Sequence, residues 1–456
     1  MNKKQKEEIQ LKKELLMNYK FDKPFVYSGD ENETEEILSL KIQPESKLRN
    51  DSSYTIKGTD FCIVLDTSGS MRSSIDSTTD KLDAAVNSVK ALYDYLSDED
   101  TISLVLYNDV VYTELDHAKN LSKQEFENHV EKAYTYNGAT NITNALRTAR
   151  KLLEKNTGNQ KKIIFLTDGL PTNDTKEEGY QEGINIAEDR IPITALGIGY
   201  DFDYQYIEKL VKPSKGTTNH IDSSKDSIRI FEETLNRAKS IVINNINLEL
   251  QVSNKVIMTD YYRAVPETTY YGKMPLKKER IYNINLDDLE KGGYAEYIFN
   301  IKIPASSRAY KGKFRVMQAT LTYDIPATGE KREIKENIVL EITDDFEMAR
   351  QEYGEVTETA TKCTVKKLED KMEIAEQNGE HRNVIKIIDE IIDLVKDFGD
   401  TEITEHYKDL REKYINTNQL PKDALIKAVS STTKINSDGI IEDEEIDFEE
   451  LENKIF

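Results

Sequence analysis

Cysteine and long apolar runs are scarce in this chain of 456 residues, which has only two cysteines, Cys62 and Cys363. Both cysteines lie in apolar or helical patterns, so we expect no disulfide framework and a reducing compartment. No run of 18 apolar residues occurs, which argues against a membrane-spanning helix and against a membrane partner. The basic residues of 1–21 are not followed by a continuous apolar core, so we expect no signal peptide and a cytoplasmic protein.

Basic residues are also in deficit. The chain has 62 Lys and Arg against 84 Asp and Glu, which gives a formal net charge of −22. A surface of this charge repels nucleic acid, so no nucleic-acid partner is expected. Hydrophobic residues make up 38% and charged residues 32% of the chain, as is typical of a globular protein, and the length allows two to four domains.

Apolar runs typical of buried strands alternate with amphipathic stretches typical of helices between residues 58 and 240. The apolar runs are 61–65, 102–107, 162–167 and 192–199, and the amphipathic stretches are 81–96, 141–155, 176–190 and 224–239. This order predicts an α/β domain with a doubly wound, mostly parallel, Rossmann-like sheet that is covered on both faces.

The segments outside this domain have other patterns. Alternation with a period of two predicts an antiparallel β-sandwich over 241–344, and a strand within 36–57 is expected to join it. Residues 345–430 predict a helical segment of two or three packed helices. The two ends are strongly charged: 1–35 predict a helix and a loop, and 431–456 an acidic tail that is mobile or held by a partner.

Polar side chains follow three of the predicted strands. The stretch FCIVLDTSGSMRSS places Asp66, Ser68 and Ser70 directly after the first strand, and Thr140 and Asp168 lie in two later loops. Ligands gather at the carboxyl ends of parallel strands, so these side chains are expected at one edge of the sheet. Two carboxylates and three hydroxyls are hard oxygen ligands that suit Mg²⁺ or Mn²⁺, whereas Ca²⁺ favours more carboxylates. No His or Cys lies in these loops, which argues against zinc.

The pattern D-x-S-x-S, then a threonine, then T-D-G, resembles the metal-ion-dependent adhesion site of von Willebrand factor A domains. The resemblance covers about residues 58–240 and includes all five metal-site positions in the right order, although Ala139 stands where many relatives have glycine. The order of an A domain, a β domain and a helical segment is similar to that of multidomain bacterial and archaeal members of this family.

The resemblance implies a role for each of the five residues. Ser68, Ser70 and Thr140 would contact the metal directly, and Asp66 and Asp168 would hold it mainly through water. One position on the metal would stay open for an Asp or Glu side chain of a partner protein. The family therefore implies a Mg²⁺-dependent protein-interaction module, with Mn²⁺ or Ca²⁺ as alternative ions. It would act as an intracellular adaptor or regulator, with an AAA+ ATPase or a kinase or phosphatase system among its possible partners. The sequence does not determine its oligomeric state.

Two other functions stay open at this point. One is a Mg²⁺-dependent phosphoester hydrolase, and the other is a surface adhesin exported by an unrecognised route. A serine hydrolase is not favoured, because Ser70 lacks a G-x-S-x-G frame and no histidine is placed beside it. A phosphotransferase of the D-x-D type would need Asp at position 68, where this chain has Ser68. We therefore expect a binding protein and not an enzyme.

Overall fold

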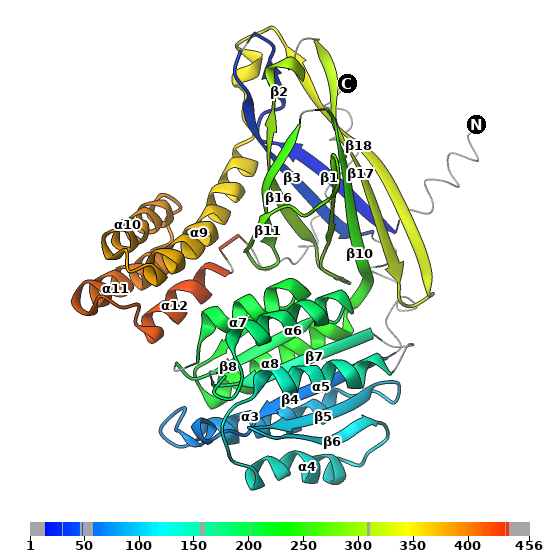
Figure 1. The fold of residues 1–456 in the computed structure, drawn as a ribbon. Helices are drawn as coiled ribbons and strands as arrows, with labels where there is room; N and C mark the ends of the chain where they lie inside the picture. Colours follow the sequence, from blue (N-terminus) through cyan, green and yellow to red (C-terminus); the bar gives the residue numbers. More distant parts are fainter. Residues whose placement is uncertain are drawn as a thin grey trace.

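The computed structural model contains two domains and a helical segment (Figure 1). The structure describes residues 14–29, 31–45, 48, 58–155, 160–169, 171–200, 202–254, 256–307, 311–433 and 435–436. We call residues 58–240 the α/β domain, the strands before and after it the β domain, and the helices from Gly354 to Thr433 the helical segment. In the view of Figure 1 the β domain lies above the α/β domain, and the helical segment lies beside both.

The α/β domain is built on a six-stranded sheet with the order β6-β5-β4-β7-β8-β9. The strands are β4 (Thr59–Asp66), β5 (Thr101–Tyr107), β6 (Val111–Ala118), β7 (Gln160–Thr167), β8 (Ile193–Ile198) and β9 (Thr217–Ile221). All neighbouring pairs are parallel except β5 with β6. The chain leaves β4 toward β5 and later returns to β7 on the other side, so the strand order reverses at β4.

Helices cover both faces of this sheet. They are α3 (Lys81–Ala91), α4 (Lys123–Glu131), α5 (Ile142–Glu154), α6 (Lys176–Glu188), α7 (Tyr204–Val211) and α8 (Ser224–Lys239). Cys62 and Val64 pack in a core with α5, α6 and α7, whereas Phe61, Ile63 and Leu65 pack in a second core with α3, α4 and α8. Every residue of β4 is buried because successive side chains enter opposite cores.

This arrangement confirms the predicted fold class. The four apolar runs are β4, β5, β7 and β8, and the four amphipathic stretches contain α3, α5, α6 and α8. Two strands and two helices were not predicted, namely β6, β9, α4 and α7. The edge strands β6 and β9 are mostly half-buried and partly polar, so they do not show the continuous apolar run of a central strand.

The β domain consists of two sheets that enclose one core. One sheet has the order β1-β3-β16-β11-β12, and the other has β13-β14-β10-β17-β18-β2 with β15 paired to β10. The first sheet contains β1 (Leu15–Phe21), β3 (Thr34–Pro44), β11 (Ile257–Val265), β12 (Thr269–Lys273) and β16 (Ala295–Ile303). The second contains β2 (Phe25–Tyr27), β10 (Ile241–Val252), β13 (Leu276–Lys278), β14 (Ile281–Asn285), β15 (Leu289–Glu290), β17 (Gly312–Ile325) and β18 (Glu330–Thr343).

The strand expected within 36–57 is β3, which pairs antiparallel with β1 and β16. The helix and loop expected over 1–35 are wrong for the described part of that segment, where β1 and β2 are strands. Leu15 and Phe21, at the two ends of β1, are buried in the sandwich core. Burial against β3 outweighs the local helical preference of this Lys- and Glu-rich segment. Residues 1–13 lie outside the described residues.

The helical segment contains four helices among the described residues, where two or three were expected. They are α9 (Gly354–Gln377), α10 (His381–Asp397), α11 (Thr401–Thr417) and α12 (Lys422–Thr433). Helix α9 packs on β11 through Ala360 and Cys363, while α10, α11 and α12 share one core with α5, α6 and α7. The segment therefore touches both domains.

The expected boundary of the acidic tail at residue 431 is also wrong. Helix α12 continues to Thr433, and Thr432 is fully buried. The rest of the tail, residues 437–456, lies outside the described residues. In the described part of the chain, no helix is both long and apolar enough to span a membrane.

Candidate metal centre

The candidate metal centre lies at the carboxyl end of β4, where the strand order reverses. Asp66 is the last residue of β4 and is fully buried. Its Oδ1 accepts a hydrogen bond from the Ser68 amide at 2.8 Å, which closes the loop after the strand. Its Oδ2 accepts hydrogen bonds from Thr167 Oγ1 at 2.8 Å and from Tyr107 Oη at 3.1 Å. The neighbouring strands β5 and β7 therefore orient this carboxylate.

Two serines and the second aspartate form a continuous chain of oxygen atoms. Ser68 Oγ lies 3.1 Å from Ser70 Oγ, and Ser70 Oγ donates to Asp168 Oδ1 at 2.7 Å. Ser68 and Asp168 are each 2% exposed, whereas Ser70 between them is exposed, so the chain of atoms runs from the buried strand end to the surface. The structure thus brings together the first loop and the loop after β7.

Thr140 joins the group from the loop before α5. Its amide donates to Thr172 Oγ1 at 2.8 Å, and its carbonyl accepts from the amides of Thr172 at 2.9 Å and Asn173 at 3.1 Å. A methyl group built on Gly169 would lie 3.7 Å from Thr140 Oγ1 and 3.8 Å from Asp66 Oδ2. The hydroxyl and the carboxylate therefore face the same small space, and the glycine leaves that space open. All five predicted residues lie around one recess.

Lys81 is part of the site, although the sequence analysis did not identify it. Its Nζ lies 2.8 Å from Asp168 Oδ2, and the two side chains are 3% and 0% exposed. Lys81 is the first residue of α3, a position where a lysine is ordinarily solvated. No pattern in the sequence distinguishes it from a surface lysine. Tyr107 and Thr167 were missed as well, because each looks like an ordinary final residue of a strand.

The electrostatics of the recess favour positive charge. Burial, and after it the nearby Asp168 carboxylate, raise the pKa of Asp66 to about 6, against hydrogen bonds from Ser68 and Thr167 that lower it. Two buried carboxylates in proximity are stabilised by a cation, and Lys81 already supplies one beside Asp168.

The donor set fits a hard divalent cation. Among the described residues, no three His, Cys, Asp or Glu side chains gather in a way that could bind a metal. A metal at this recess would therefore depend on hydroxyl oxygens, which Ser68, Ser70 and Thr140 present beside the two carboxylates. Such oxygen ligands suit Mg²⁺, Mn²⁺ or Ca²⁺ better than zinc.

Comparison with known proteins identifies the family of the α/β domain and its fold. Residues 61–170 match the family model described as the von Willebrand factor type A domain. A solved structure of a von Willebrand factor type A protein from Catenulispora acidiphila has a TM-score of 0.74 and 15% identity, and the match covers 93% of this chain and 97% of that one. The structure of the ArnB paralog VWA2 from Sulfolobus acidocaldarius has a TM-score of 0.56 at 17% identity over 92% of this chain and 98% of that one. At these identities the likeness shows the fold alone.

Curated relatives match a smaller part of the chain. The inter-alpha-trypsin inhibitor heavy chain H2 of Mesocricetus auratus is 28% identical over 196 residues, which are 40% of this chain. The matched part is 20% of the length of that relative. The similarity concerns one region of a much longer protein.

Proposed function

This chain contains a von Willebrand factor type A domain, and from that premise we propose that it is a metal-dependent protein-interaction module. It binds an Asp or Glu side chain of a partner protein through Mg²⁺ held by Asp66, Ser68, Ser70, Thr140 and Asp168. The observation that carries the proposal is the convergence of these five oxygen-bearing side chains on one recess, with Thr140 Oγ1 and Asp66 Oδ2 facing the same space beside Gly169. Domains of this family generally serve as protein-interaction modules.

In this proposal, the five residues hold the cation in two ways. Ser68, Ser70 and Thr140 bind the cation directly, and Asp66 and Asp168 hold it through water. The bound cation supplies a Lewis acid that attracts a carboxylate oxygen of the partner. Tyr107 and Thr167 orient Asp66, and Lys81 orients Asp168. Because Lys81 offsets one of the two aspartate charges, the cation stays electron-poor and gains by binding an external carboxylate.

We propose a binding role and no catalytic one. Both oxygens of Asp66 and both oxygens of Asp168 already accept hydrogen bonds from the protein. These bonds fix both carboxylates in orientations that suit water-bridged binding of a cation. Activity on generic phosphoesters would contradict this part of the proposal.

The proposed setting is the cytoplasm, where the protein acts as an adaptor or regulator. Cys62 and Cys363 are both buried free thiols, which agrees with a reducing compartment. By analogy with the family, an AAA+ ATPase or a kinase or phosphatase system is a suitable partner.

Affinity capture from the native host tests the proposal. Capture is run with Mg²⁺ and with EDTA, and the bound proteins are identified by mass spectrometry. Thr140→Ala should reduce the Mg²⁺-dependent fraction about 10- to 100-fold, the scale of one lost charge-assisted contact. Thr140→Ser keeps the hydroxyl and is the matched control. Equal capture by wild type and Thr140→Ala, or capture unaffected by EDTA, would refute metal-mediated recognition.

A further inference from the structure

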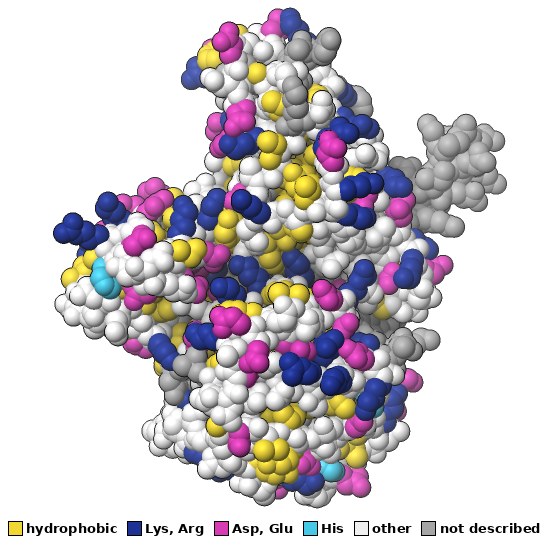
Figure 2. Space-filling model, viewed as in Figure 1, with side chains coloured by type: hydrophobic (Ala, Val, Ile, Leu, Met, Phe, Trp, Pro, Cys, Tyr) yellow, Lys and Arg dark blue, Asp and Glu magenta, His cyan; other side chains and the backbone are white. Residues whose placement is uncertain are grey.

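A second recess lies between the α/β domain and the β domain, at the opposite end of the parallel sheet from Asp66. Its volume is about 680 Å³, within the range of small-molecule sites, which often form between domains. Lys162 near the start of β7, Thr194 of β8 and Thr217 of β9 line it on one side, and Arg263 and Asp287 of the β domain line it on the other. We call this recess the interdomain cavity. Figure 2 shows Lys and Arg side chains in the hollow where the domains and the helical segment meet.

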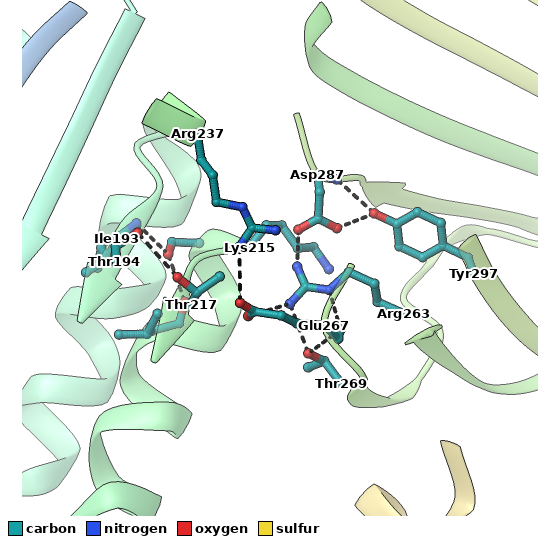
Figure 3. Close-up of polar contacts among 12 residues, drawn as sticks. Ile193, Thr194, Lys215, Thr217, Arg237, Arg263, Glu267, Thr269, Asp287 and Tyr297 are labelled. Carbon is teal, nitrogen blue, oxygen red and sulfur yellow. Dashed lines mark hydrogen bonds and ion pairs between the residues drawn. The ribbon is translucent and has the colours of Figure 1, made fainter. Parts of the chain in front are cut away.

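One wall of the interdomain cavity is a closed network around Arg263 (Figure 3). Arg263 is 2% exposed and forms an ion pair with Asp287, which also accepts a hydrogen bond from Tyr297. Its remaining nitrogens donate to the Glu267 carbonyl at 2.8 Å and to Thr269 Oγ1 at 3.0 Å. Arg263 and Asp287 therefore satisfy each other and leave no charge for a ligand.

Arg237 of α8 is paired as well. Its Nε donates to Glu290 Oε1 at 3.1 Å, and its Nη1 lies 3.5 Å from Glu267 Oε1. Both contacts cross from the α/β domain to the β domain, and Figure 3 shows the one with Glu267. Glu267 and Glu290, two further carboxylates of the cavity wall, therefore share the guanidinium group of Arg237.

Two lysines of the cavity wall, Lys162 and Lys215, form no ion pair among the described residues. Among the described residues, no carboxylate lies within 4.0 Å of Lys162 Nζ or Lys215 Nζ. Lys215 Nζ lies 3.4 Å from the centre of the Tyr271 ring and 3.4 Å from Tyr261 Oη, so its contacts are with aromatic groups. Burial lowers the pKa of Lys215 to about 7 and that of Lys162 to about 8, although nearby aspartates act in the opposite direction. Each ammonium group would be stabilised by an added negative charge.

The remaining carboxylates of the cavity wall form no ion pair with either lysine, although Asp288, Glu290 and Glu267 act on Lys162 from a greater distance. Glu233 pairs with Arg229 at 2.9 Å. Asp288 accepts hydrogen bonds from the Asn245 amide at 3.2 Å and from Gln160 Nε2 at 3.2 Å, and burial raises its pKa to about 6. Lys162 and Lys215, together with the exposed Arg190, are thus the basic groups of the cavity wall that form no ion pair among the described residues, and Asp288 is the carboxylate of the wall without one.

We propose that the interdomain cavity binds a small organic anion whose carboxylate or phosphate group contacts Lys162 and Lys215. The site is independent of the candidate metal centre, because it lies at the other end of the sheet and shares no residue with it. A ligand there contacts α8 through Thr234 and Arg237 and contacts the β domain at the same time, so it holds the two domains together.

Isothermal titration calorimetry on the full chain tests this site. Inorganic phosphate and succinate are titrated separately at constant ionic strength, so that general screening is the same in both arms. Lys215→Met and Lys162→Met keep most of the side-chain volume and remove the charge. Lys331→Met is the matched control, since Lys331 lies on β18 and its side chain is 85% exposed.

Saturable binding of at least one of the two anions is expected. The affinity for that anion should fall at least tenfold in each cavity variant and stay unchanged in Lys331→Met. Whether phosphate or succinate binds shows whether the ligand carries a phosphate or a carboxylate group. Mg²⁺ binding should be normal in both cavity variants, which separates this site from the metal centre. The proposal is overturned if neither anion binds saturably, or if both cavity variants bind like wild type.

Discussion

At the residue scale, hydrogen bonds from the protein hold the candidate metal centre in place. Asp66 is not a loose residue at the sheet edge, because it is fully buried and accepts three hydrogen bonds. Its substitution therefore affects both ion binding and stability. A replacement that keeps the shape of the side chain but removes its charge separates the two effects.

Asp66→Asn should abolish Mg²⁺ binding and leave a folded protein. The amide keeps the shape of the side chain but removes its negative charge and one acceptor. We expect no Mg²⁺ heat in calorimetry and a loss of about 1–3 kcal/mol in the free energy of unfolding, from one buried donor left without an acceptor. Asp98→Asn, at an exposed position, is the control. Wild-type Mg²⁺ affinity in Asp66→Asn would rule out the site.

Lys81→Met should make the fold depend on Mg²⁺. Removing one partner of a buried ion pair costs about 3–5 kcal/mol, because the other charge stays buried without compensation. Here that charge is Asp168, which lies beside Asp66. Thermal unfolding should show a lower Tm without metal and a larger rise on adding Mg²⁺ than in wild type. Lys81→Arg should behave more like wild type. An equal Mg²⁺-induced rise in Lys81→Met and wild type would show that Lys81 does not compete with the metal.

At the element scale, helix α8 is joined to the β domain without a flexible linker. Only Ser240 separates α8 from β10, and its carbonyl accepts from the Lys291 amide at 2.7 Å. Arg237, in the last turn of α8, pairs with Glu290 of β15, and Lys239 lies 2.7 Å from Asp100 Oδ2. These contacts restrain the carboxyl end of the helix from both domains.

Inserting Gly-Ser between Lys239 and Ser240 should release this restraint. Backbone hydrogen exchange is expected to increase across 224–239, and partner affinity in Mg²⁺ is expected to rise, if the junction holds the helix in place. The same insertion after Gly329, in the turn between β17 and β18, is the control. Unchanged exchange and affinity would mean that the α/β domain is a rigid binding site.

At the scale of the whole molecule, the helical segment connects the two domains. Lys367 of α9 pairs with Asp260 of β11 at 2.5 Å, and Lys212 of the α/β domain lies 3.8 Å from Asp370 of α9. The end of α12 contributes as well: the Thr433 carbonyl accepts from the Thr268 amide at 2.6 Å, and Asn436 Nδ2 donates to Thr268 Oγ1 at 3.1 Å. The last described residues of the chain thus contact the β domain.

Two truncations of the carboxyl-terminal end should differ sharply in stability. A chain ending at residue 436 keeps all of these contacts, and the removed segment carries nine Asp and Glu residues against one Lys, so that its like charges oppose formation of a core of its own. Its Tm should equal that of the full chain. A chain ending at residue 430 loses Thr432, which is buried and bonded to Glu369, and should lose at least about 1–3 kcal/mol of stability. A large fall in Tm for the longer truncation would show that 437–456 stabilise the fold.

Local sequence patterns determined much of this protein. The continuous apolar run of β4 predicts a buried parallel strand, since both its faces meet helices, and the D-x-S-x-S spacing fixes Asp66, Ser68 and Ser70 in one short loop. The reversal of strand order at β4 places Thr140 and Asp168 at the same edge, so these residues too could be predicted. Each prediction needed only periodicity or the general rules of parallel sheets.

Only the tertiary structure decided the rest, because it depends on contacts between distant residues. Strand β1 has a helix-like composition and becomes a strand because β3 offers it a partner. Lys81 becomes part of the metal centre because α3 starts beside Asp168, which is 87 residues away in the chain. The interdomain cavity follows from the docking of two domains, so the unpaired charges of Lys162 and Lys215 leave no local pattern. Burial and pairing of charge are properties of the packed chain, and a sequence shows them only where the partners are close along it.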